Sequence, residues 1–105
     1  LLGPLLQAAG DLLVNEVADH ETIDKTWMIT SGTKMGPCAI MDMIGLETVY
    51  NVEKLWSERT GEKNRKARVD YFKKHFIDTN KLGMKTGEGF YKYPKPTYRN
   101  PDFLS

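Results

Sequence analysis

The sequence predicts an all-α fold, a helical bundle of about five helices joined by short links. Three observations support this prediction. Apolar residues recur at helical spacing through most of residues 1–80. Helix-capping and helix-breaking residues divide that region into separate segments. Three glycines within seven positions mark the point after which no further helix is expected, namely Gly83, Gly87 and Gly89.

The first helix is expected over residues 1–17, where a wide apolar stripe follows helical spacing. This stripe is already complete at Leu1, with no initiator Met and no capping residue before it. We therefore expect the helix to begin upstream and the chain to be a piece of a longer protein. A second helix is expected over about 20–30, with Asp19 as its cap and Ile23 and Trp27 on one face.

A short, nearly all-apolar helix is expected over about 37–44. Pro37 suits its first position, and Gly45 suits the left-handed residue that ends a helix. Asp42 is the one acid among its apolar residues. Other helices must cover such a helix, and we expect it to form one wall of a site or of a subunit interface.

Two longer helices should follow. The fourth, about 46–60, is expected to stop at Thr60-Gly61 and to bury Leu46, Val49, Val52 and Trp56. The fifth, about 65–80, is expected to be capped by Asn64, to show its bases to solvent and to bury Val69, Phe72 and Phe76. Residues 90–93 alternate weakly and could be extended, and the proline-containing tail should be irregular and pinned by Tyr98 and Phe103.

Size and charge exclude several function classes. The chain has 105 residues, enough for one domain, and a net charge of +1. No global field therefore favours nucleic acid or a membrane surface, and no apolar run approaches the length of a membrane span. A single cysteine excludes an internal disulfide framework, so a cytoplasmic location is expected.

The charges are unevenly distributed along the chain. Residues 1–24 hold five acids and no Lys or Arg, whereas residues 63–74 hold six bases and one acid. The two segments could attract each other or face different partners. The basic segment could bind nucleic acid, but its interleaved apolar residues favour a solvated helix face.

Local spacing provides no catalytic or metal site. His20 and His75 have no nucleophile or carboxylate placed beside them, and two histidines with one cysteine have no ligand spacing. Cys38 is expected to be a small buried hydrophobe, although a helix N-terminus could make it reactive. The run Lys85-Thr86-Gly87-Glu88-Gly89 could approach a phosphate, but it lacks the P-loop order, and locally a plain turn is favoured. No Gly-x-Gly-x-x-Gly occurs, so this chain cannot supply a dinucleotide fold.

Two segments together make the sequence recognisable. Residues 34–48, Lys-Met-Gly-Pro-Cys-Ala-Ile-Met-Asp-Met-Ile-Gly-Leu-Glu-Thr, resemble the signature of the C-terminal domain of L-3-hydroxyacyl-CoA (3-hydroxybutyryl-CoA) dehydrogenases. The form in that family is Met-Gly-Pro-Phe, apolar residues, Asp, then Gly-Leu-Asp. Residues 82–93, Leu-Gly-Met-Lys-Thr-Gly-Glu-Gly-Phe-Tyr-Lys-Tyr, are similar to the family's terminal Lys-Thr-Gly-x-Gly-Phe-Tyr signature. The resemblance runs from Leu1 to about Tyr93.

The resemblance implies a role for the whole chain. Residues 1–105 would form the single C-terminal helical domain, like the 6-phosphogluconate dehydrogenase C-terminal domain. This domain makes most of the homodimer contact and closes one side of the substrate cleft. A separate N-terminal Rossmann domain, absent from this chain, binds NAD and carries the catalytic His–Glu pair. In that enzyme the His removes the proton of the 3-hydroxyl of an acyl-CoA, the Glu orients the His, and hydride passes to NAD to leave a ketone, in fatty acid or butanoate metabolism. This chain alone should therefore be inactive.

The resemblance also implies site residues. Lys85 matches the lysine that reaches NAD, which reverses the local preference for a plain turn. Met35, Gly36 and Pro37 match the loop and helix start that face the acyl group. Cys38 departs from the usual Phe, which removes bulk near the pocket or the interface and leaves the acyl-length preference open. A related hydroxy-acid dehydrogenase of the gulonate type and a non-catalytic helical interaction module are the alternatives.

Overall fold

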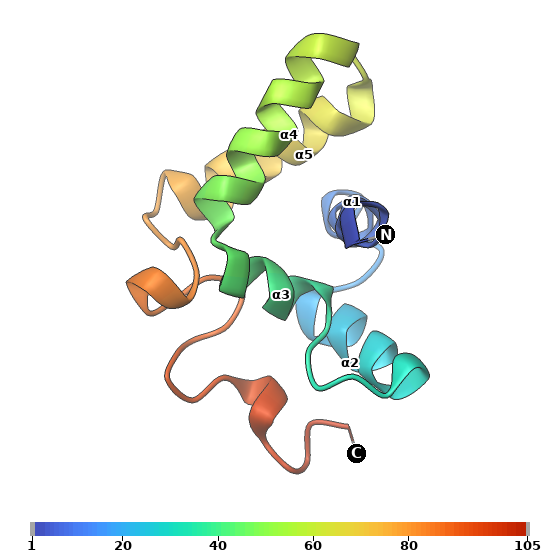
Figure 1. The fold of residues 1–105 in the computed structure, drawn as a ribbon, viewed down its shortest axis with the longest axis vertical. Coiled ribbons are helices and arrows are strands. Elements are labelled where there is room, and N and C mark those ends of the chain that lie inside the picture. Colours follow the sequence, from blue (N-terminus) through green and yellow to red (C-terminus); the bar gives the residue numbers. More distant parts are fainter. Residues whose placement is uncertain (1, 105) are drawn as a thin grey trace.

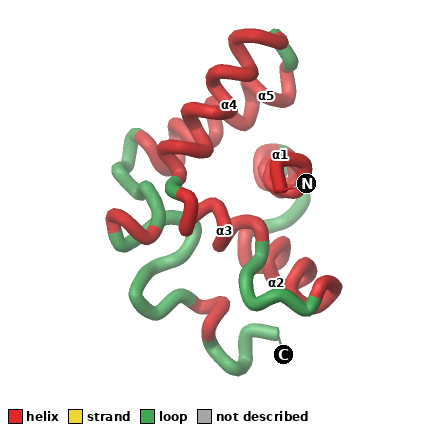
Figure 2. Tube along the Cα trace, in the orientation of Figure 1, coloured by secondary structure: helices red, strands yellow, loops and turns green. Residues whose placement is uncertain are grey.

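A computed structural model describes residues 2–104, and it shows five α-helices followed by a long, mostly irregular C-terminal segment (Figures 1 and 2). The helices are α1 (Leu2–Val14), α2 (His20–Ser31), α3 (Pro37–Ile44), α4 (Leu46–Thr60) and α5 (Lys63–Phe72). Three short turns follow, the π-helical η1 (Lys73–Ile77) and the 3-10 helices η2 (Met84–Thr86) and η3 (Thr97–Arg99). The all-α prediction is confirmed, because the described residues form isolated β-bridges but no strand.

Helix α3 is the hub of the fold, as its apolar sequence predicts. It contacts α1, α2 and α4, while α4 and α5 form an antiparallel hairpin beside it (Figure 1). The C-terminal segment returns past α3 and places η3 against α2. The core is built around Cys38, Ala39, Met41, Leu46 and Phe72, which are at most 1% exposed.

The helix ends follow the capping residues. The Thr22 N–H donates to Asp19 Oδ1 at 2.7 Å, which confirms Asp19 as the cap of α2. Pro37 opens α3, and Gly61, left-handed at φ 68°, closes α4 as predicted. Gly45 ends α3 with a positive φ of 108°, but its ψ of 124° places it outside the left-handed helical region.

Three predicted helix boundaries are wrong. The cap of the fifth helix is Glu62 rather than Asn64, because the chain turns helical at Lys63 directly after the extended Glu62. The α-helix ends at Phe72, and the π turn η1 extends it only to Ile77, whereas residue 80 was expected. It closes because the Lys81 N–H bonds to the Phe76 carbonyl at 2.8 Å while Asn80 takes a φ of 56°. The first helix likewise ends at Val14 rather than 17, and Leu1 lies outside the described residues.

Burial on α4 differs from the prediction. Leu46 is fully buried and Val49 partly buried, but Val52 and Trp56 are 50% and 43% exposed. One side of α4 packs on α5, and the side that carries these two residues borders an open groove instead of a helix. On α5 and η1, Phe72 and Phe76 are buried as expected, whereas Val69 is only partly buried.

Of the two alternatives for the acidic and basic segments, mutual attraction is found at one residue, Arg68. This side chain is 3% exposed and donates to Asp11 at 2.6 Å and to Glu53 at 3.0 Å. It passes directly over Gly10, where an added Cβ would lie 2.7 Å from the Arg68 Cδ. Arg68 therefore ties α1 to the hairpin of α4 and α5.

Among residues 2–104, no helix combines the length and the apolar character needed to cross a lipid bilayer.

Candidate functional site

The two segments that carry the sequence signatures meet at Asp42. This residue lies on α3 and is 1% exposed. Its Oδ1 accepts the Phe90 N–H at 2.8 Å, and its Oδ2 accepts the Tyr91 N–H at 3.1 Å and the Tyr93 hydroxyl at 2.7 Å. One carboxylate on the central helix thus fixes the loop of residues 83–93, hereafter the Lys85 loop.

Glycines allow this close approach. A Cβ on Gly83, which has a φ of 107°, would collide with the Asp42 backbone carbonyl. A Cβ on Gly89 would collide with Asp42 Oδ1 and would lie 2.8 Å from the Gly83 Cα. The glycines at these two positions of the signature are therefore needed for packing against Asp42.

A second buried carboxylate, Asp24 of α2, joins the same structure. It accepts the N–H groups of Cys38 and Ala39 at 2.8 and 2.9 Å and the Tyr91 hydroxyl at 2.8 Å. Gly36 packs against it so tightly that a Cβ there would lie 2.5 Å from the Asp24 Cγ. Asp24 therefore caps α3 from a neighbouring helix and also holds Tyr91.

Burial controls the protonation of this cluster. It raises the pKa of Asp24 and of Asp42, although the surrounding N–H and O–H donors oppose the rise. Burial and the adjacent Asp24 also raise the pKa of the Tyr91 hydroxyl, and burial and Asp42 raise that of Tyr93, so both remain proton donors. The cluster is consequently a structural joint in which the tyrosine hydroxyls and backbone N–H groups donate and the two carboxylates accept.

Cys38 belongs to the core side of this joint. It is fully buried, and burial followed by the charge of Asp24 strongly raises the pKa of its thiol. The thiol is therefore neutral and inaccessible, whereas a reactive cysteine needs an exposed thiolate. The structure thus favours the small buried hydrophobe over the reactive Cys38. The Cys38 side chain reaches no solvent. The smaller volume of Cys compared with the family's Phe therefore changes the packing of the core and not the surface of a pocket.

Lys85 lies on the outer side of the Lys85 loop. It is exposed on η2, and no ion pair joins it to another described residue. The Thr86 hydroxyl stabilises the turn, since it accepts the Leu82 N–H at 2.9 Å and donates to the Glu88 carbonyl at 3.0 Å. The neighbouring Lys81, in contrast, pairs with Glu88 at 3.3 Å. The loop thus presents two exposed ammonium groups without an ion-pair partner among the described residues, Lys85 on η2 and Lys92 further along the loop.

The three predicted acyl-facing residues lie in different surroundings. Met35 is partly buried and lines a groove of about 620 Å³ with Lys34, Arg99 and Leu104. Pro37 lines a separate apolar pocket of about 310 Å³ between α1 and α2. Gly36 is buried against Asp24. Of the three, only Met35 combines partial exposure with a groove that has basic side chains.

The histidines and the basic segment have ordinary structural environments. His20 packs edge-on to Tyr91 at 4.8 Å between ring centroids, and His75 lies over Tyr71 at 4.4 Å. No cluster of three metal-ligating side chains occurs within the part of the chain that the structure describes. In the segment 63–74, ion pairs engage Arg65, Arg68 and Lys73.

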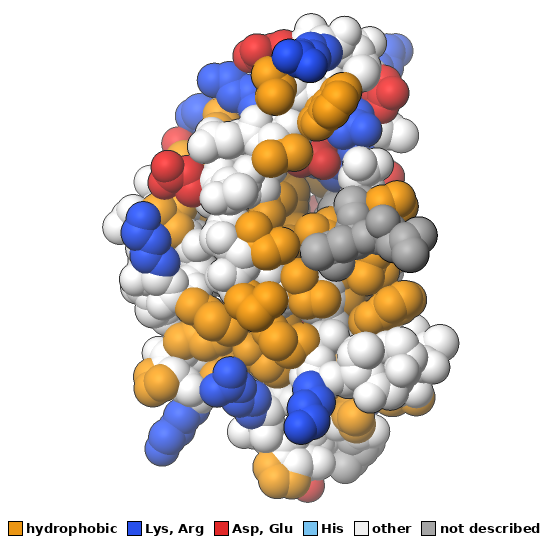
Figure 3. All heavy atoms as spheres, viewed as in Figure 1, with side chains coloured by type: hydrophobic (Ala, Val, Ile, Leu, Met, Phe, Trp, Pro, Cys, Tyr) orange, Lys and Arg blue, Asp and Glu red, His pale blue; other side chains and the backbone are white. Residues whose placement is uncertain are grey.

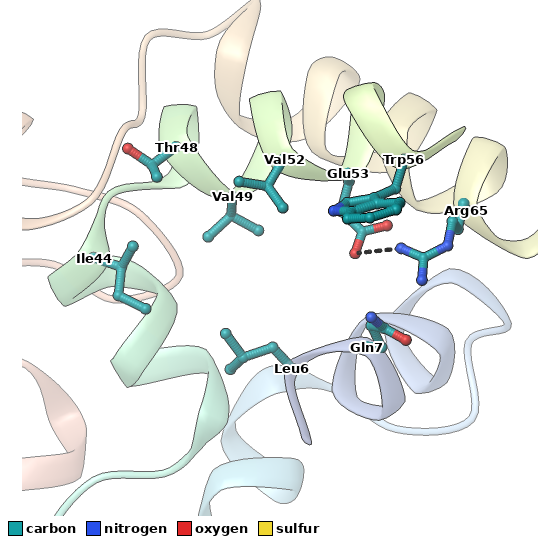
Figure 4. Close-up of a pocket in the computed structure, with 9 residues that line it drawn as sticks. All are labelled: Leu6, Gln7, Ile44, Thr48, Val49, Val52, Glu53, Trp56 and Arg65. Carbon is teal, nitrogen blue, oxygen red and sulfur yellow. Dashed lines mark ion pairs between the residues drawn. The ribbon is translucent and has the colours of Figure 1, made fainter. Parts of the chain in front are cut away.

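An open groove of about 460 Å³ separates α1 from α4 (Figure 4). Apolar side chains from three helices point into it, and the Glu53–Arg65 pair, 3.9 Å apart, closes one end (Figure 4). Its apolar lining consists of Leu6, Ile44, Val49, Val52 and Trp56. On the face seen in Figure 3, apolar side chains gather along the middle of the molecule, with basic side chains below them.

Asp24 and Asp42 are not among the site residues that the sequence predicts. For Asp42 a signal was present. A lone acid in a helix too apolar for a surface is buried, and a buried carboxylate requires donors from elsewhere in the chain.

Comparisons with known proteins agree with this architecture. Residues 1–93 match the family model for the 3-hydroxyacyl-CoA dehydrogenase C-terminal domain. The human mitochondrial hydroxyacyl-coenzyme A dehydrogenase is 37% identical over 93 residues, which cover 89% of this chain and 29% of that protein. The fatty acid oxidation complex subunit alpha of a Psychrobacter species is 36% identical over 95 residues, 89% of this chain and 13% of that protein.

Two solved structures share the fold. A diketoreductase that acts on dicarbonyl compounds has a TM-score of 0.80 and 48% identity, over 89% of this chain and 31% of its own. The (S)-3-hydroxybutyryl-CoA dehydrogenase of Ralstonia eutropha has a TM-score of 0.74 and 28% identity, over 90% of this chain and 33% of its own. The chain therefore spans about a third or less of the length of these relatives.

Proposed function

The chain belongs to the 3-hydroxyacyl-CoA dehydrogenase family as a C-terminal domain. From this premise we propose that it is the C-terminal helical domain of an NAD-dependent dehydrogenase. The observation that supports this is the joint at Asp42, which holds both signature segments together and leaves Lys85 exposed. The His–Glu pair would come from an N-terminal Rossmann domain, so the 105-residue chain alone should be inactive. The reaction would convert the 3-hydroxyl of an acyl-CoA to a ketone.

The residue that we propose to contact the cofactor is Lys85. Its side chain fits an anionic group, because it is exposed, carries a positive charge without an ion-pair partner in the described chain, and stands on a glycine-bounded turn. NAD, when bound, supplies the hydride acceptor. Lys85 would bind one of its phosphates and so help hold the closed cleft.

A matched pair of lysines tests this role. In the protein that joins this chain to its dinucleotide-binding domain, Lys85→Ala should weaken NADH binding at least roughly tenfold, since a hydrogen bond to a charged group contributes about 1.5–3 kcal/mol. Lys81→Ala removes an ammonium from the same surface that is already paired with Glu88, so it should leave the dissociation constant unchanged. Fluorescence titration with NADH measures both, and equal constants for the two variants would refute the role of Lys85.

We propose that Met35, Gly36 and Pro37 form the substrate wall, with Met35 as its exposed member. The substrate class has two candidates. An acyl-CoA follows from the family, whereas the 48% identity with a diketoreductase favours a free dicarbonyl or hydroxy acid as the alternative. Initial rates with NADH, comparing acetoacetyl-CoA with a free diketo ester, distinguish them. Oxidation of NADH by neither substrate would instead favour the non-catalytic interaction module.

We further propose that the groove between α1 and α4 is the homodimer contact. Val52 and Trp56 are half-exposed there, beside the other apolar lining residues Leu6, Ile44 and Val49. Val52→Lys should therefore yield monomers in light scattering. Leu55→Lys is the control, because Leu55 is 47% exposed on the same helix but does not line the groove. A wild-type monomer, or dissociation by both variants alike, would contradict this assignment.

The expected cytoplasmic location also remains a proposal. It follows from the single cysteine, which is buried as a neutral thiol and leaves no internal disulfide to form. Fractionation of cells that express the full-length protein tests it, and recovery in another compartment would overturn it.

A further inference from the structure

The hydrogen-bond donors to the buried Asp42 carboxylate come from a segment other than its own helix. It belongs to α3, yet the three donors that it accepts all come from residues 90–93. Asp24, in contrast, receives two of its donors from the start of α3 and stabilises that helix. The bonds of Asp42 therefore serve the placement of the Lys85 loop more than the stability of its own helix.

The Lys85 loop is internally closed and would move as one piece. The Gly83 N–H donates to the Glu88 carbonyl at 2.9 Å, and the Tyr93 N–H donates to the Gly87 carbonyl at 3.0 Å. Towards the helices, the Tyr91 hydroxyl also bonds to Asp24 and to the His20 carbonyl, and the Leu46 N–H donates to the carbonyl of Leu82, which directly precedes the loop. Asp42 supplies three bonds to the loop, and two of the loop's three glycines, Gly83 and Gly89, pack against it.

Only a carboxylate suits this position. Two backbone N–H groups approach different oxygens of Asp42, at 2.8 and 3.1 Å. An asparagine offers one oxygen, so its NH2 group would face an N–H and push part of the loop away. The displacement would pass along the closed loop to η2, where Lys85 lies.

We propose that Asp42 is the positioning residue for Lys85, holding the loop so that the ammonium group stands where it binds the cofactor. This inference rests on the proposed contact of Lys85 with the cofactor. Asp42 itself touches neither substrate nor cofactor. Its effect should consequently appear in cofactor affinity and in the local stability of the loop.

The first measurement uses amide hydrogen exchange on the 105-residue chain. Asp42→Asn should lower protection at Phe90 and Tyr91 at least about tenfold more than at the amides of α4 and α5. Arg68→Lys is the matched control, because it weakens buried polar bonds at α5 without touching the loop. Loss of protection spread evenly over the chain in Asp42→Asn would overturn the proposal. If that variant does not fold, Tyr93→Phe removes a single donor and should show the same local pattern.

The second measurement uses the protein with its dinucleotide-binding domain. Asp42→Asn should raise the Michaelis constant for NADH roughly tenfold with little change in kcat, and it should add nothing in a Lys85→Ala background. Arg68→Lys should leave that constant unchanged. If Lys85→Ala is effective but Asp42→Asn behaves like Arg68→Lys, the positioning role is refuted. If Lys85→Ala itself has no effect, the proposed cofactor contact fails, and the exchange data alone decide whether Asp42 holds the loop.

Discussion

Replacing Arg68 by methionine should destabilise the chain by about 3 kcal/mol, because it leaves a buried acid without its main partner. Arg68 donates to Glu53 at 3.0 Å and to Asp11 at 2.6 Å, and Glu53 is 8% exposed. Burial alone would lower the pKa of the guanidinium, but the bonds to Asp11 and Glu53 raise it, so Arg68 stays charged in the folded state. Methionine keeps much of the apolar stem that covers Gly10 and removes only the charge and the donors.

The magnitude follows from what each acid loses. Breaking a buried pair by removing one partner costs about 3–5 kcal/mol. The Asp11 side chain is 40% exposed and returns to water at small cost, and Arg65 remains 3.9 Å from Glu53. The low end of the range therefore applies. For a domain of this size, about 3 kcal/mol lowers the Tm by roughly 12–24 °C.

Urea and thermal unfolding followed by far-UV circular dichroism measure this change. The double variant Arg68→Met with Glu53→Gln should be more stable than Arg68→Met alone, because the stranded charge is gone. A coupling free energy of about 1–3 kcal/mol is expected from the double-mutant cycle. A loss below about 1 kcal/mol for Arg68→Met, or strictly additive effects, would show that the ion pair does not stabilise the contact between α1 and the hairpin.

Three further predictions concern caps and close contacts. Asp19→Ala should cost about 1 kcal/mol in urea unfolding. The Thr22 N–H lowers the pKa of Asp19 below its ordinary 3.8, so this difference should be present above pH 3.8 and vanish as the pH falls through the lower folded value. Tyr93→Phe, which removes a donor to Asp42, should cost about 1.5–3 kcal/mol. Tyr98→Phe should cost nothing, since its buried hydroxyl has no hydrogen-bond partner in the described chain, and an equal loss for both tyrosines would contradict this. Gly36→Ala should lower stability by about 1–3 kcal/mol, and a wild-type Tm would refute the close packing.

Local chemistry predicts the helix boundaries well where one residue dominates the backbone. Asp19, Pro37 and Gly61 each act through a local hydrogen bond or a fixed dihedral angle, and each is found where it was expected. The start of α5 was misplaced because Asn64 has the better capping side chain, whereas the chain enters the helix two residues earlier. Its end was misplaced because a π turn interrupts the periodic pattern that the prediction extends.

Periodicity identifies the apolar side of a helix but does not say what covers it. Val52 and Trp56 lie on the apolar side of α4 as predicted, yet they border the open groove instead of a helix. The apolar pattern is the same whether the covering surface lies within the chain or on a partner. The exposure of these two residues therefore supports the proposed dimer contact, which depends on an apolar side that the chain itself leaves open.

The contacts of Asp42 explain why the two signature segments, residues 34–48 and 82–93, occur together. These contacts do not determine the substrate. Its carboxylate requires two backbone donors and two glycines from residues 83–91. Replacing Asp42 alone would leave buried N–H groups unpaired, and replacing either glycine alone would create a steric clash with Asp42. These residues hold the domain together, and their contacts do not depend on which substrate the proposed cleft takes. That agrees with a shared fold between a diketoreductase and a 3-hydroxybutyryl-CoA dehydrogenase. Substrate preference should therefore follow residues outside the joint, and in this chain Met35 and its basic neighbours Lys34 and Arg99 are the first to exchange when that preference is tested.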